Sequence, residues 1–124
     1  MNYSQNTILI VEDESDLLQL CIDVFEIEGF NVIATSDGEE GLSAFEENHI
    51  DLVISDSHMP KMNGLELLES MEASLKKTPP FFLLTGDLEV TEEELKEKGA
   101  TGLMAKPFNL DEILEQVKET LIAR

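Results

Sequence analysis

The chain has 124 residues, 42% of them hydrophobic, and its 27 acidic against 8 basic residues give a formal net charge of −19. This length suits one domain with one core, so we expect a single domain over residues 1–124 with its core between about residues 7 and 122. The scarcity of Lys and Arg argues against direct binding of nucleic acid or anionic membranes, and the lack of both a ~20-residue apolar span and a secretory signal makes the cytoplasm the expected location.

Two short apolar runs in the first third of the chain predict buried strands. Residues 7–11 (TILIV) and 31–35 (NVIAT) are nearly continuous in apolar side chains, which is typical of strands covered on both faces of a parallel sheet. Between them, residues of helical periodicity predict a helix that has Ser15 as its N-cap and stops at Gly29. Its apolar stripe includes the lone Cys21, which we expect to be an ordinary core residue.

The same alternation continues to the end of the chain. The most polar helix is predicted to start at Thr91, a capping residue, and to end at Gly99. In chain order, the remaining predicted elements are a helix within residues 37–48, a strand at 51–55, a helix at 63–71, a strand at 81–85, a helix within 90–99, a strand at 102–105 and a helix from Leu110 to Leu121.

Five alternations of strand and helix favour an α/β fold, in which a doubly wound parallel sheet carries helices on both faces. In such sheets, ligands bind beyond the carboxyl ends of the strands, where the strand order switches. The polar residues at those ends are Glu12 and Asp13 after the first strand, Asp56 after the third, Thr85 at the end of the fourth and Lys106 after the fifth.

Three carboxylates at one edge would repel one another, so a cation is expected among them. Oxygen ligands with vacant positions suit Mg²⁺, which keeps several waters and binds through one or two carboxylates together with phosphate. Lys106 adds positive charge and Thr85 a hydroxyl group, and together they could hold the oxygens of a phosphoryl group. An aspartate can act as a nucleophile toward phosphorus, and we choose Asp56 because it ends the middle strand.

Four motifs then show a resemblance to a known family. ILIVEDE (8–14), DSHMPKMNG (56–64), LLTG (83–86) and AKPF (105–108) follow predicted strands in this order. Together they resemble the receiver domain of two-component response regulators, including the single-domain chemotaxis regulator. The resemblance spans residues 7–122 and implies a flavodoxin-like (βα)₅ fold with strand order 2-1-3-4-5.

The resemblance also implies roles for the site residues. Asp56 would receive a phosphoryl group from a sensor histidine kinase or a phosphotransfer protein. Asp13 would bind Mg²⁺ directly and Glu12 mainly through water, with the backbone carbonyl of His58 as a further ligand. Lys106 and Thr85 would contact the phosphoryl oxygens. The chain would thus be a phosphorylation switch that catalyses only its own phosphorylation and dephosphorylation.

One residue departs from the family pattern. Leu103 stands where receivers usually have Tyr or Phe, so a switch that turns an aromatic ring inward is not expected here. Three questions stay open: whether the chain acts alone on a target protein or has lost an output domain, whether it is a monomer or a phosphorylation-linked dimer, and whether it is a receiver used only for protein binding. A phosphatase with an aspartate nucleophile is a further alternative, which His58 disfavours because such enzymes typically have a second aspartate there.

Overall fold

A five-stranded parallel sheet forms the centre of the computed structural model, which describes residues 3–59, 61–86, 91–105 and 109–123. The strand order is β2-β1-β3-β4-β5, as expected, so β2 and β5 are the edges. The strands are β1 (Thr7–Val11), β2 (Asn31–Thr35), β3 (Leu52–Asp56), β4 (Phe81–Thr85) and β5 (Gly102–Ala105). The helices are α1 (Ser15–Ile27), α2 (Gly38–Glu47), α3 (Gly64–Glu72), α4 (Glu92–Glu97) and α5 (Leu110–Ile122).

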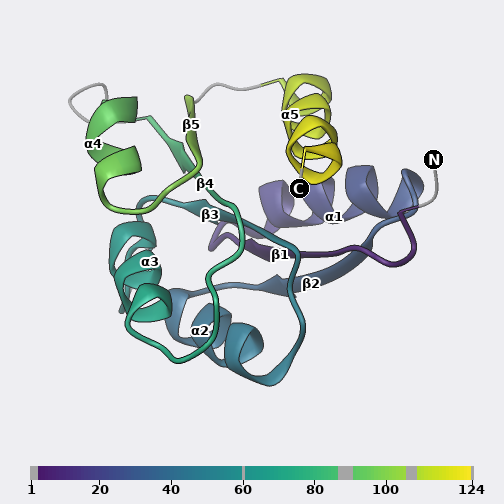
Figure 1. Cartoon of the computed structure of the whole chain (residues 1–124). Coiled ribbons are helices and arrows are strands. Elements are labelled where there is room, and N and C mark those ends of the chain that lie inside the picture. The colour runs from purple at the N-terminus through teal and green to yellow at the C-terminus, as the bar shows by residue number, and fades with distance from the viewer. Residues whose placement is uncertain (1–2, 60, 87–90, 106–108, 124) are drawn as a thin grey trace.

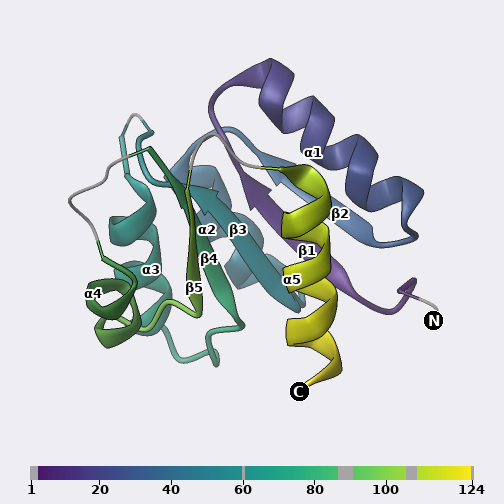
Figure 2. The ribbon, with the colours of Figure 1, turned by 90° about the horizontal axis from the view of Figure 1, so that it is seen from above.

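Helices cover both faces of this sheet. Helices α1 and α5 lie on one face and α2, α3 and α4 on the other (Figures 1 and 2). Since successive side chains of a strand point to opposite faces, Ile8 and Ile10 of β1 pack with α1 and α5, whereas Leu9 and Val11 pack with α2 and α3. Cys21 is buried in the first of these two cores, as predicted.

Two helix ends are as the sequence predicts and one helix start is not. Gly29 and Gly99 follow α1 and α4 with φ of +102°, a backbone conformation that glycine adopts without steric cost. Thr91 caps α4 as predicted and accepts a hydrogen bond from the backbone N–H of Glu94. Ser15, however, is the first helical residue of α1, and Glu14 is its N-cap. The prediction was wrong by one residue because the Glu12 carboxylate accepts the Glu14 N–H and fixes the turn that enters the helix.

The third strand lies one residue later than predicted. Asp51 precedes β3, and its carboxylate accepts a hydrogen bond of 2.8 Å from the backbone N–H of Thr7, the first residue of β1. At the other end, Asp56 pairs in register with Leu84 of β4 and is therefore itself a strand residue. The shifted start and the shifted end of β3 both arise from contacts with neighbouring strands. The apolar pattern of residues 51–55 gives no information about those contacts.

No helix in the described part of the chain combines the length and the apolar character needed to cross a membrane.

Candidate functional site

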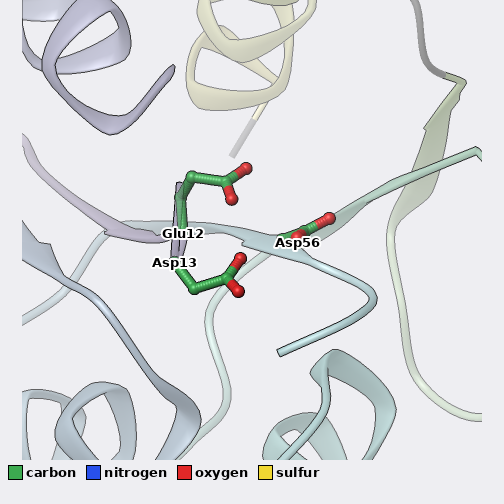
Figure 3. Close-up of side chains that lie close together, drawn as sticks. All are labelled: Glu12, Asp13 and Asp56. Carbon is green, nitrogen blue, oxygen red and sulfur yellow. The ribbon is translucent and has the colours of Figure 1, made fainter. Parts of the chain in front are cut away.

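The carboxyl ends of β1 and β3 bring three predicted site residues together. Glu12 and Asp13 directly follow β1, and Asp56 is the last residue of β3, the strand next to β1. One carboxylate oxygen from each lies within 4.8 Å of the others. Figure 3 shows the three side chains close together, with those of Glu12 and Asp13 extending toward Asp56. The predicted convergence of Glu12, Asp13 and Asp56, which we call the acidic cluster, is therefore present.

The three carboxylates differ in their surroundings. Glu12 is 1% exposed, and its Oε2 accepts the N–H of Glu14 at 3.0 Å, which ties it to the start of α1. Asp56 is 5% exposed, and its Oδ1 accepts the N–H of Ser57 at 2.9 Å. Asp13 is exposed to solvent. The acidic cluster thus has two buried members that are fixed by backbone hydrogen bonds and one member at the solvent boundary.

Of the remaining predicted site residues, the structure describes Thr85 and His58 but not Lys106. Thr85 ends β4 and is 2% exposed, on the strand that pairs with β3. His58 lies two residues after Asp56 and is exposed, with its Nδ1 2.7 Å from the Ser57 hydroxyl oxygen. Lys106 lies outside the described residues. Leu103 is partly buried and packs against the core shared with α2, α3 and α4.

The donor set of the acidic cluster fits a hard divalent cation. Carboxylates at such a separation repel one another, by about 4 kcal/mol for two unit charges 4 Å apart at an effective dielectric constant of 20. A divalent cation between them would replace that repulsion with attraction. The cluster offers only oxygen ligands, which suit Mg²⁺ and disfavour softer ions.

A cavity of about 560 Å³ lies near the amino ends of strands β3, β4 and β5, opposite the strand ends that hold the acidic cluster. Its lining includes Ile50, Pro80 and Thr101, each just before a strand, together with the exposed side chains of Lys76 and Lys77. None of the acidic cluster contributes to it. The cavity therefore does not coincide with the chemistry that the carboxylates offer, and the acidic cluster is the candidate site.

Two features of the site were missed at the level of sequence. The Ser57 N–H that orients Asp56 could have been suspected, because a backbone donor directly after a strand-end aspartate is close enough to reach it. The second feature is a close contact between Met62, in the segment after Asp56, and Gly38 at the start of α2. The sequence could not have predicted it, because the two residues are about 24 positions apart and share no local pattern.

A sequence model of the response regulator receiver domain matches residues 8–118. The chain belongs to this family. Receiver domains are the switches of two-component signalling: an aspartate is phosphorylated, the conformation changes, and Mg²⁺ binds at an acidic pocket. The family functions as a signalling switch and not as an enzyme of the usual kind, and response regulators are paired with histidine kinases.

Curated relatives of this receiver domain include two regulators from Escherichia coli K12. The chain is 35% identical to the transcriptional regulatory protein CpxR over 116 residues, which are 94% of this chain and 49% of CpxR. It is 36% identical to the regulatory protein AtoC over 109 residues, 87% of this chain and 23% of AtoC. The receiver domain therefore spans about half, or less, of the length of these relatives.

The chain also resembles solved structures, and here the match covers nearly the whole length of each solved chain. The chemotaxis response regulator CheY4 of Vibrio cholerae superposes with a TM-score of 0.84 at 29% identity, covering 93% of this chain and 98% of CheY4. A structure described as a putative response regulator from Chloroflexus aurantiacus J-10-fl gives 0.85 at 33% identity, with 96% and 98% coverage. The flavodoxin-like fold expected from the sequence is thus confirmed.

Proposed function

We propose that Asp56 is the phosphoacceptor of this receiver domain and that its donor is a sensor histidine kinase or a phosphotransfer protein. The observation that carries the proposal is the acidic cluster: three carboxylates from adjacent strands lie within 4.8 Å at the carboxyl edge of the sheet. Asp56 is the choice among them because it ends β3, the central strand of the sheet, whereas Glu12 and Asp13 are adjacent residues after β1.

Glu12, Asp13, Asp56 and the backbone carbonyl of His58 are the proposed Mg²⁺ ligands. Bound there, Mg²⁺ supplies positive charge that offsets the carboxylates and the phosphoryl oxygens. The Ser57 N–H holds one oxygen of Asp56 and so orients the carboxylate for attack. We place Thr85 and Lys106 as donors to the phosphoryl oxygens, Thr85 by virtue of its position at the end of the neighbouring strand.

In the proposed transfer, an oxygen of Asp56 forms a bond to phosphorus as the bond between phosphorus and the donor's histidine nitrogen breaks. That nitrogen keeps the bonding electron pair and takes up a proton. In hydrolysis, a water oxygen bonds to phosphorus, the bond to Asp56 breaks, and inorganic phosphate leaves. The domain thus catalyses only its own phosphorylation and dephosphorylation.

Phosphorylation would add about −1.5 to −2 charge at Asp56, and we propose that the resulting conformational shift controls a protein partner. The output is either a separate target or an output domain beyond a receiver core of about residues 7–122. Leu103 packs in the core beside α4, so the switch would proceed without an aromatic ring at this position. We further propose a cytoplasmic protein that does not bind nucleic acid through this domain, as a monomer or a phosphorylation-linked dimer.

Intact-mass measurement after incubation with acetyl phosphate or phosphoramidate, with and without Mg²⁺, tests this function. We expect a single phosphate adduct on the parent chain in the presence of Mg²⁺ and none on Asp56→Asn. Asp51→Asn is a matched control, because Asp51 lies just before the other end of β3 and is also buried. It should be phosphorylated like the parent. An adduct that persists on Asp56→Asn, or a folded parent that accepts no phosphate, would rule out the proposed role.

A further inference from the structure

The segment that follows Asp56 rests against the first turn of α2. This β3–α3 loop comprises residues 57–63, of which Pro60 lies outside the described residues. Gly38 is the first residue of α2, and a Cβ atom added there would lie 2.5 Å from the backbone oxygen of Met62 and 2.7 Å from its Cβ. Because these are not the far end of a flexible side chain, the loop itself would have to move to admit any side chain at Gly38.

A second contact joins the same two segments. Asp37 is the N-cap of α2 and accepts the N–H of Glu40 through Oδ1 at 2.8 Å, while its Oδ2 lies 3.8 Å from Nζ of Lys61 in the β3–α3 loop. Lys61 has φ of 69°, an uncommon conformation for a residue with a side chain, which persists where the surroundings enforce it. The loop is thus held to α2 by a close backbone approach and by an ion pair.

The β3–α3 loop in turn sets the geometry around Asp56. Its first residue, Ser57, donates its N–H to Asp56 Oδ1, and the Ser57 carbonyl accepts the N–H of Gly64 at 3.1 Å, which closes the loop. A displacement of the loop at Met62 would therefore reach the donor that orients the carboxylate. His58, whose carbonyl is a proposed Mg²⁺ ligand, lies in the same segment.

We infer that the first turn of α2 positions the phosphorylation site. Gly38 is a positioning residue that sets how closely the β3–α3 loop approaches α2. The ion pair between Asp37 and Lys61, which we call the tether, holds the loop to α2. The inference rests on the proposed function of Asp56 for its effect on phosphorylation. Its structural content, that α2 controls the placement of the loop, stands on the contacts alone.

Gly38→Ala compared with Gly41→Ala tests the inference. Both substitutions lie in α2, and both place a Cβ at a tight contact, but at Gly41 the contact is with side-chain atoms of Val11 and Leu67 in the core, the nearest at 2.9 Å. The chain has two histidines, His58 in the loop and His49 elsewhere, so their ring C–H resonances report on the loop and on a remote internal control. Mg²⁺ affinity by calorimetry and the initial rate of phosphorylation by phosphoramidate complete the readout.

We expect Gly38→Ala to shift the His58 resonances and not those of His49, to weaken Mg²⁺ binding about threefold to tenfold and to slow phosphorylation roughly tenfold or more. Gly41→Ala should lower the unfolding midpoint while leaving His58 and Mg²⁺ binding like those of the parent. Unchanged His58 resonances and Mg²⁺ affinity in Gly38→Ala, or equal changes in both variants, would overturn the inference. If the parent itself is not phosphorylated, the proposed function fails, and the resonances and Mg²⁺ affinity still decide this inference.

Lys61→Met tests the tether without touching a tight contact, because the Lys61 side chain is 60% exposed. If Gly38→Ala does not fold, the His58 resonances of Lys61→Met test whether α2 positions the loop. We expect the same direction of change at His58 with a smaller amplitude, and no change in Lys77→Met, a control with another exposed lysine. A His58 signal identical in Lys61→Met and the parent would overturn the role of the ion pair.

Discussion

Asp13 is the exposed member of the acidic cluster, so its charge can be removed without opening a hole in the core. We predict that Asp13→Asn makes the metal-free protein more stable by about 1 kcal/mol, because one source of repulsion near Glu12 and Asp56 is lost in a partly hydrated setting. The same change should weaken Mg²⁺ binding roughly tenfold, since the ion loses a charged ligand. Urea unfolding in the presence of a chelator and calorimetric titration with Mg²⁺ measure the two effects.

Asp16→Asn is a matched control for this prediction. Asp16 lies in the first turn of α1 and is exposed, but its negative charge is favourable at a helix N-terminus. Its loss should therefore lower stability slightly and leave Mg²⁺ affinity unchanged. A metal-free Asp13→Asn protein that is less stable than the parent would show that the carboxylates of the acidic cluster do not repel one another appreciably.

At this scale, the residues that converge were predictable and their finer placement was not. Glu12, Asp13 and Asp56 could be grouped because the carboxyl ends of parallel strands meet at one edge. The exposure of Asp13 and the hydrogen bond from Ser57 to Asp56 depend on how the loops after each strand turn. A pattern of apolar runs does not encode such turns, and the role of each site residue stays a prediction until phosphorylation is measured.

At the scale of elements, α2 is fixed at its carboxyl end as well as at its start. Lys76, in the connection from α3 to β4, donates through Nζ to the backbone carbonyl oxygens of Phe45 and Asn48, the latter at 2.8 Å, and lies 4.9 Å from the centre of the Phe45 ring. Carbonyls at a helix C-terminus lack partners within the helix and favour positive charge. Lys76 therefore stabilises the last turn of α2.

We predict that Lys76→Met lowers the free energy of unfolding by about 1 kcal/mol, from the lost interactions with the helix end and the aromatic ring. The melting temperature should fall by roughly 4 °C. Lys77→Met provides the control, since Lys77 makes no hydrogen bond or ion pair with the residues that the structure describes. Equal melting temperatures for Lys76→Met and Lys77→Met would contradict a specific role for Lys76, and neither change should affect phosphorylation by small donors.

The elements were more predictable than their ends. Apolar runs identified four strands with the bounds that the structure has, because strands buried on both faces leave an unambiguous record of hydrophobicity. The third strand was displaced by one residue because Asp51 bonds to Thr7 in the neighbouring strand. The start of α1 was displaced because a carboxylate two residues before Glu14 determines it. Both errors in these bounds come from contacts with residues outside the predicted strand or helix itself.

At the scale of the whole molecule, Lys118 joins the last helix to the beginning of the chain. Its Nζ lies 2.7 Å from Oε2 of Glu28, the C-cap of α1, and 5.8 Å from the centre of the Tyr3 ring, which stacks on Phe30. The hydrogen bond with Glu28 is the main reason that the pKa of Lys118 is raised above its ordinary value of 10.5. The ammonium form is therefore favoured in the folded protein.

A pH dependence follows from the direction of this shift. A raised pKa in the folded state means that the stabilisation is fully present below the ordinary pKa of 10.5 and is lost as the pH rises through the higher folded value. We expect the parent to be more stable than Lys118→Met near pH 8, and we expect this difference in stability to shrink as the pH is raised above 10.5, through the raised pKa of Lys118 in the folded protein. Urea midpoints at both pH values check this. A difference that stays constant or grows at the higher pH would contradict it.

Within the described part of the chain, the edge strand β2 has a strand partner on one side only, and its other side offers backbone groups to which a second chain could hydrogen-bond. At neutral pH the net charge of −19 keeps copies of the molecule apart. That protection disappears near the calculated isoelectric point of about 4.1, where the strand remains as apolar as before. The acidity of the chain thus also protects against edge-to-edge aggregation, and mild acid is a condition in which this protein becomes vulnerable to self-association.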